Sequence, residues 1–149
     1  MFNKIRNIFW DRVAKTVIKD CPRIATLELK DSNTYHPPLV NRRCHHNSAW
    51  HLQHNDEVIA VARGFYIDSG NFPIAHFVCL DKWGNWFDPT LPLDYIRDNK
   101  FYAYNIYKTV EEFSCRNCDD ALLDMKKLMY GTLNGWKKRL LVLEKHNNF

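Results

Sequence analysis

Residues 74–88 predict a β-hairpin near the middle of the chain. The segment 74–81 is rich in apolar and β-branched side chains, and a four-residue turn that contains Gly84 follows it. Apolar segments joined by a short glycine-containing turn are typical of two paired antiparallel strands. Side chains alternate between the two faces of a strand, so the turn can set a register that brings His76 and Asp88 to one face.

Helices are expected at the N-terminus, before the hairpin and at the C-terminus. Residues 2–19 place apolar side chains at helical spacing with basic residues on the other side, which indicates a surface helix packed on the core. A membrane-binding amphipathic helix has the same pattern. Asn41 is a suitable N-cap for a helix that runs to about residue 54, which puts Cys44 in the first turn. Asn117 can cap a C-terminal helix, and a second apolar stripe continues it at Leu133, Trp136, Leu140 and Leu143.

Three further strands are expected, at residues 24–30, 57–67 and 101–110. A chain of 149 residues without a long linker predicts one domain that spans residues 1–149. We therefore expect an α+β fold. In this fold a helix that carries Cys44 packs on an antiparallel sheet that carries His76 and Asp88, and N- and C-terminal helices flank the two.

Composition and charge argue against several classes of protein. The net charge is +4 and the basic residues are scattered, so we do not expect nucleic acid as the main partner. No segment reaches the ~20 apolar residues of a membrane helix, and the charged N-terminus lacks the apolar core of a secretory signal. The five cysteines fit no disulfide framework, which favours reduced thiols. We expect a cytoplasmic protein without a membrane partner or a cofactor, and the oligomeric state stays open.

Cys44, His76 and Asp88 are the residues whose chemistry is most informative. A thiol reacts as its thiolate, and an ordinary cysteine has a pKa near ~8.5. The positive end of a helix dipole and a nearby imidazolium both lower that pKa. Cys44 at a helix start supplies the first condition, and His76 on a facing strand can supply the second. Asp88 can accept a hydrogen bond from one ring nitrogen of His76 and aim the other nitrogen at sulfur.

In order, spacing and flanking residues, the segment 44–90 is similar to the transglutaminase-like core of the papain-like cysteine protease superfamily. That family has a helix-opening Cys, a strand with Arg and Gly, a strand His and an Asp in a Gly-x-Trp…Asp-Pro-Thr signature. The matching residues here are Cys44, Arg63, Gly64, His76, Gly84, Trp86, Asp88, Pro89 and Thr90. The run 86–90 is the most specific part of the match.

The resemblance implies a catalytic triad, with Cys44 as nucleophile, His76 as base and Asp88 as the residue that orients the base. It implies a hydrolase or acyl transferase that acts on an amide, peptide or isopeptide bond of a protein or peptide through a thioester. The family contains thiol proteases, peptide N-glycanases, transglutaminases and inactive members, so the resemblance does not select the substrate.

The donor that would stabilise an oxyanion is left open by the sequence. No Gln or Trp stands just before Cys44. The backbone N–H of Cys44 could serve, with Asn41 or Asn47 as a side-chain donor, and His45 could contact substrate. Asn47 could instead stabilise the helix or a neighbouring loop.

Other interpretations exist for several of these residues. A zinc site at Cys44, His51 and His54 is conceivable, but Cys44 and His51 lie about 10 Å apart along a helix axis. We therefore expect no metal and interpret these histidines as solvated or partly buried surface residues. His76 could be a core histidine, and Asp88 a turn residue.

Two interpretations concern the other cysteines. Cys115 and Cys118 form a lone Cys-x-x-Cys with no second pair nearby, which we attribute to chance. Cys79 is expected to point away from His76 or to pack in the core.

The alternative function is a catalytically silent member of the same fold that binds a protein partner. Exposed tryptophans would then supply the contact surface. The candidates are Trp10, Trp83 and Trp136.

Overall fold

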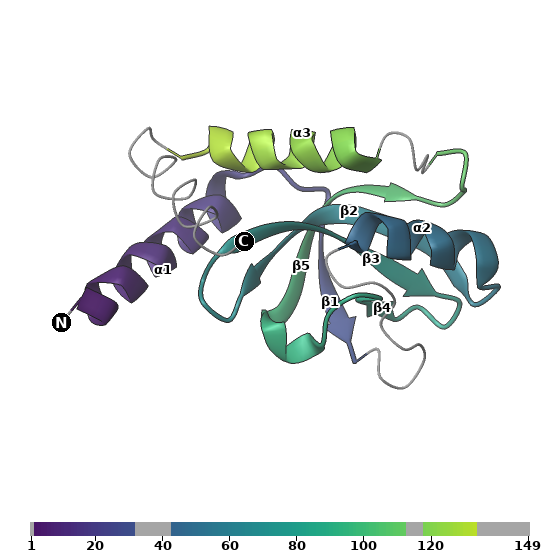
Figure 1. Cartoon of the computed structure of the whole chain (residues 1–149), viewed down its shortest axis with the longest axis horizontal. Coiled ribbons are helices and arrows are strands. Elements are labelled where there is room, and N and C mark those ends of the chain that lie inside the picture. The colour runs from purple at the N-terminus through teal and green to yellow at the C-terminus, as the bar shows by residue number, and fades with distance from the viewer. Residues whose placement is uncertain (1, 32–42, 113–117, 134–149) are drawn as a thin grey trace.

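A computed structural model describes residues 2–31, 43–112 and 118–133, and over these ranges the fold is α+β, as expected (Figure 1). Its elements in chain order are α1 (Phe2–Asp20), β1 (Ala25–Lys30), α2 (Cys44–His54), β2 (Val58–Asp68), β3 (Pro73–Asp81), β4 (Trp86–Phe87), the 3-10 helix η2 (Leu93–Tyr95), β5 (Ile96–Tyr107) and α3 (Cys118–Gly131).

The strands form one sheet in the order β1-β4-β3-β2-β5, and the sheet closes because β5 also pairs with β1. The expectation of a wholly antiparallel sheet is wrong, since β1 and β4 run parallel. Strand direction cannot alternate all the way around a closed ring of five, so one neighbouring pair must be parallel. All the other neighbouring pairs are antiparallel.

The β3–β4 hairpin forms where the sequence predicts it. The Asp81 carboxylate accepts hydrogen bonds from the backbone N–H groups of Trp83 at 2.9 Å and Asn85 at 2.8 Å. Gly84 has φ 87°, a left-handed conformation that glycine adopts without a steric cost. β4 pairs with β3 only at Cys79 and Leu80, so β4 does not cover the part of β3 that carries His76.

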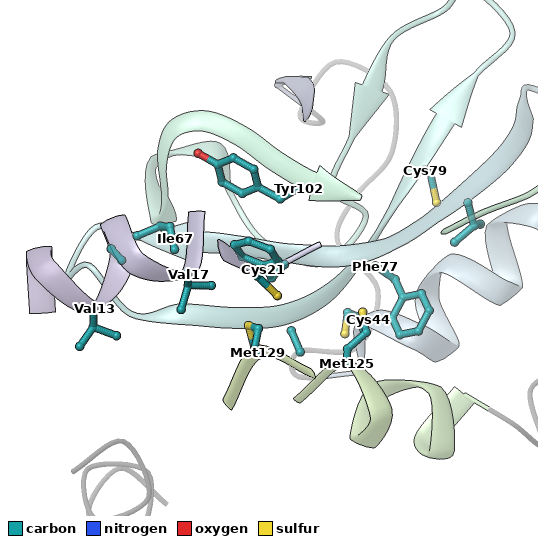
Figure 2. Packing of buried hydrophobic residues seen from close by; sticks show 14 of the residues in the cluster. Val13, Val17, Cys21, Cys44, Ile67, Phe77, Cys79, Tyr102, Met125 and Met129 are labelled. Atoms are coloured by element: carbon teal, nitrogen blue, oxygen red, sulfur yellow. The ribbon is translucent and has the colours of Figure 1, made fainter. Parts of the chain in front are cut away.

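Two apolar clusters lie on the two faces of the closed sheet. The outer cluster fills the space between the sheet and the three helices, and Figure 2 shows side chains of α1, α3 and β3 meeting there. It includes Val13, Val17, Phe77, Cys79, Met125 and Met129. The inner cluster contains Leu29, Ala62, Tyr66, Val78, Ile96, Phe101 and Ala103. His76 lies two residues before Val78 in β3, so its side chain points to the same inner face of the sheet.

The N-terminal helix packs as a surface helix. Trp10, Val13 and Val17 are buried against the core, whereas Lys4 and Ile5 are exposed. Burial of Trp10 removes it from the candidates for an exposed partner surface. Trp83 is exposed, and Trp136 lies outside the described residues. Within the described ranges, no helix combines the length and the apolar composition that a bilayer-crossing segment requires.

Some predicted boundaries are wrong. α2 begins at Cys44 with Arg43 as N-cap, at φ −115° and without a side-chain capping bond, so Asn41 is not the cap. β5 spans Ile96–Tyr107 rather than 101–110. Several residues with an expected role lie outside the described ranges: Asn41, Cys115, Asn117, Leu140 and Leu143.

Candidate active site

Three different elements bring Cys44, His76 and Asp88 together. Cys44 is the first residue of α2, His76 lies in the middle of β3, and Asp88 directly follows β4. α2 packs on β3, and the hairpin turn returns the chain so that Asp88 reaches His76. The three residues are 7%, 3% and 2% exposed, respectively, so their mutual interactions are poorly screened by water.

The Asp88 carboxylate is fixed through both of its oxygens. Asp88 Oδ2 lies 2.6 Å from His76 Nε2. Asp88 Oδ1 accepts the backbone N–H groups of Thr90 at 2.8 Å and Leu91 at 3.1 Å. The residue is thus both an orienting partner for the imidazole, as expected, and a turn residue, which the sequence had offered as an alternative.

The second ring nitrogen of His76 faces the sulfur of Cys44. The thiol and the imidazole are hydrogen-bonded, and because Nε2 is held by Asp88, Nδ1 is the nitrogen that faces the sulfur. Cys44 also stands at the N-terminus of an 11-residue helix, where the helix dipole favours negative charge. The imidazole therefore bridges a sulfur and a carboxylate.

This arrangement favours the charged form of both groups, because it lowers the pKa of Cys44 and raises the pKa of His76. Burial alone raises the pKa of Cys44, but the positive charge of His76, the hydrogen bond of its imidazole and the adjacent ring of His45 lower it to about 6. Burial alone lowers the pKa of His76, but the negative charges of Asp88 and Cys44 and hydrogen bonds to both raise it to about 10. Between these values the pair is a thiolate and an imidazolium.

The other described cysteines lie in different environments. Cys79 is fully buried in the outer cluster, and burial strongly raises the pKa of its thiol. Cys21 lies 2.6 Å from the hydroxyl of Tyr104, and burial raises its pKa as well. Cys79 thus packs in the core as expected, and only Cys44 among these three thiols has a lowered pKa.

The candidate oxyanion and substrate residues have specific partners. Asn47 Nδ2 donates a hydrogen bond to Thr90 Oγ1 at 3.0 Å, so this amide is directed at the loop after β4, which fits the loop-stabilising role that the sequence left open beside that of an oxyanion donor. His45 is buried next to Cys44, contributes to the lowered pKa of that thiol, and lies with its ring centroid 6.4 Å from that of Phe77. Asn41 lies outside the described residues, and a substrate contact for His45 stays a prediction.

The two histidines of the conceivable zinc site, His51 and His54, lie in different environments. His51 is buried, with its ring edge-on to Phe87, whereas His54 is exposed beside Trp50. The interpretation of His51 as a surface residue is wrong, because α2 turns that side chain onto the sheet. In residues 2–31, 43–112 and 118–133, no group of three potential ligands is placed to hold a metal ion.

Sequence reasoning missed Tyr66, which lies beside the imidazole. Its ring meets that of His76 edge-to-face at 5.2 Å and 88°. Burial raises the pKa of the Tyr66 hydroxyl, and the negative charges of Asp88, Asp68 and Cys44 raise it further. Tyr66 reaches His76 diagonally because Gly64 is the direct partner of His76 across the β2–β3 pair. Only the strand register reveals this neighbour.

The geometry has the elements that nucleophilic chemistry at sulfur requires. A thiolate stands at a helix start, an imidazolium can supply a proton, and a carboxylate holds the imidazole in one orientation. The backbone N–H of Cys44 lies in the first turn, where an α-helix offers no acceptor for it. No protein-family model, no curated protein and no solved structure matches this chain.

Proposed function

We propose that this chain is a cysteine-dependent hydrolase or acyl transferase that acts on an amide, peptide or isopeptide bond. Cys44 is the nucleophile, His76 transfers protons and Asp88 orients His76. The observation that carries the proposal is the buried imidazole that bonds Asp88 at 2.6 Å through one nitrogen and Cys44 through the other. A histidine placed for packing alone has no reason to bridge a thiol and a carboxylate.

The reaction proceeds in two steps. The Cys44 thiolate attacks the carbonyl carbon of the amide, and the S–C bond forms as the C–N bond breaks. The amine leaves with the proton that His76 donates, so the first product is an amine and the protein holds a thioester. Water, or a second amine, then loses a proton to His76 and attacks the thioester, which releases the acyl group and restores the thiolate.

Helix, strands and residue order together support a transglutaminase-like core as the fold of this site. The nucleophile opens a helix that packs on the histidine strand, and the acid follows the next strand in the same sheet. A protein or peptide substrate and a reducing, cytoplasmic setting belong to the same proposal, since Cys44 must stay a free thiol. A silent binding module would keep the fold without needing the thiolate.

Removal of His76 is expected to raise the pH at which Cys44 becomes reactive. In the wild-type chain, alkylation of Cys44 by iodoacetamide should rise with a midpoint near pH 6, because the pKa of the thiol is lowered to about 6. In His76→Ala the buried thiol loses its main cation, and the midpoint should move above about 8.5. Peptide mapping by mass spectrometry at a series of pH values measures both midpoints.

Midpoints are compared rather than rates because a thiolate of lower pKa is also a weaker nucleophile, which partly offsets its larger population. Cys21 and Cys79 are built-in controls, since both are buried with raised pKa values and stay unlabelled at neutral pH in any folded variant. A wild-type midpoint at an ordinary thiol value, unchanged in folded His76→Ala, would refute an activated nucleophile and favour the silent binding module.

A further inference from the structure

A buried hydrogen bond connects α2, the helix that carries Cys44, to the loop that follows Asp88. Asn47 in α2 donates from Nδ2 to Thr90 Oγ1 at 3.0 Å, and both residues are almost fully buried. The backbone N–H of Thr90 in turn bonds Asp88 Oδ1 at 2.8 Å. The bonds Asn47–Thr90–Asp88–His76–Cys44 form a ring, because Asn47 lies one helical turn after Cys44.

The position of α2 decides whether the sulfur meets the imidazole. The N-cap Arg43 makes no side-chain capping bond, so the start of the helix is not fixed from that side chain. Apolar contacts of Ala49 with the outer cluster hold α2 on the sheet, but such contacts are non-directional and allow small sliding. A hydrogen bond weakens steeply with misalignment, so the Asn47–Thr90 bond selects one placement.

We propose that Asn47 and Thr90 are positioning residues that lock the nucleophile helix onto the Asp88 loop and thereby set the Cys44–His76 contact. Neither residue touches the reacting atoms in this role. The proposal rests on the proposed function, because it concerns the geometry of the same thiolate and imidazolium. It develops the loop-stabilising role that the sequence left open for Asn47 beside that of an oxyanion donor, because the Asn47 amide acts on the site through the loop.

Thr90→Val and Thr90→Ser separate this role from simple packing. Valine keeps the shape of the side chain but removes the acceptor for Asn47 Nδ2, so the sulfur should drift from the imidazole. The midpoint of Cys44 alkylation should then rise by about one pH unit, a tenfold change in the thiol ionisation equilibrium. Thr90→Ser keeps the hydroxyl and should retain the wild-type midpoint. Asn47→Leu removes the donor instead and should shift the midpoint by the same amount as Thr90→Val.

Thr16→Val is the matched control, since the Thr16 hydroxyl bonds the carbonyl of Arg12 within α1, and the Cys44 alkylation midpoint of this variant should not move. If Thr90→Val and Asn47→Leu are folded and keep the wild-type midpoint, the positioning role is overturned, even if their thermal stability falls. If one of these two variants fails to fold, the Cys44 alkylation midpoint of the other decides whether the positioning role holds. Failure of the proposed function looks different: the wild-type midpoint itself would then be ordinary and insensitive to His76→Ala.

Discussion

Asp88→Asn is expected to lower the acyl-transfer rate by about three orders of magnitude, although it only replaces one oxygen by an amide nitrogen. The backbone N–H groups of Thr90 and Leu91 both point at Asp88 Oδ1, so they would hold the carbonyl oxygen of the asparagine. The NH₂ group would then face His76 Nε2 and donate to it. That forces the remaining ring proton onto Nδ1, which faces Cys44, and the imidazole can no longer take a proton from the thiol.

The loss is measurable as release of nitrophenol from p-nitrophenyl acetate, a small activated acyl donor. Asp81→Asn is the matched control, because Asp81 Oδ1 accepts backbone N–H groups in the β3–β4 turn in the same way, whereas its Oδ2 accepts from the side chain of Asn85 and not from an imidazole. It should retain near wild-type turnover. Activity of folded Asp88→Asn within a factor of a few of wild type would show that the carboxylate does not set the tautomer of His76.

Gly64→Ala is expected to destabilise the fold by about 3–5 kcal/mol, which is enough to unfold many domains of this size. A Cβ at this position would lie 2.1 Å from the carbonyl oxygen of Tyr102 and 2.9 Å from Cα of Ala103. These are backbone atoms of β5, so the clash can be relieved only by opening the β2–β5 pair. Gly64 is also the β2 partner of His76, so the candidate site should be lost with the pairing.

Denaturant unfolding followed by far-UV circular dichroism measures this effect. Gly131→Ala is the control, because a Cβ there meets no atom within 4 Å, and alanine favours a helix over glycine by up to ~1 kcal/mol. The control should be as stable as wild type or slightly more so. A Gly64→Ala chain with wild-type stability would mean that β2 and β5 are not packed as closely as described.

The hairpin could be predicted from sequence because its signals are local, whereas the capping signal assigned to Asn41 misplaced the start of the helix, whose N-cap is Arg43. The spacing of apolar residues and the Gly84 turn indicate two paired strands, and strand alternation limits where His76 and Asp88 can point. The order of the motif then places Cys44 at a helix start. These three residues are the ones that the structure brings together.

The other features of the fold and of the candidate site depend on contacts between segments that are distant in sequence. The register of β2 against β3 places Gly64 opposite His76 and Tyr66 beside it, and no local pattern encodes that register. The Asn47–Thr90 bond joins residues that are 43 positions apart. The parallel β1–β4 pair follows from closure of the sheet, which becomes evident only when all five strands are placed.

The most direct test of the central claim is capture of an acyl group on Cys44. Wild-type protein mixed with p-nitrophenyl acetate near pH 7, quenched in acid and mapped by mass spectrometry should carry an acetyl thioester on Cys44. Cys21 and Cys79 should stay unmodified, and the adduct should be strongly reduced in folded His76→Ala. A folded wild-type chain that acquires no acetyl group on Cys44, or acquires it equally without His76, would contradict a thiolate made nucleophilic by its imidazole and carboxylate neighbours.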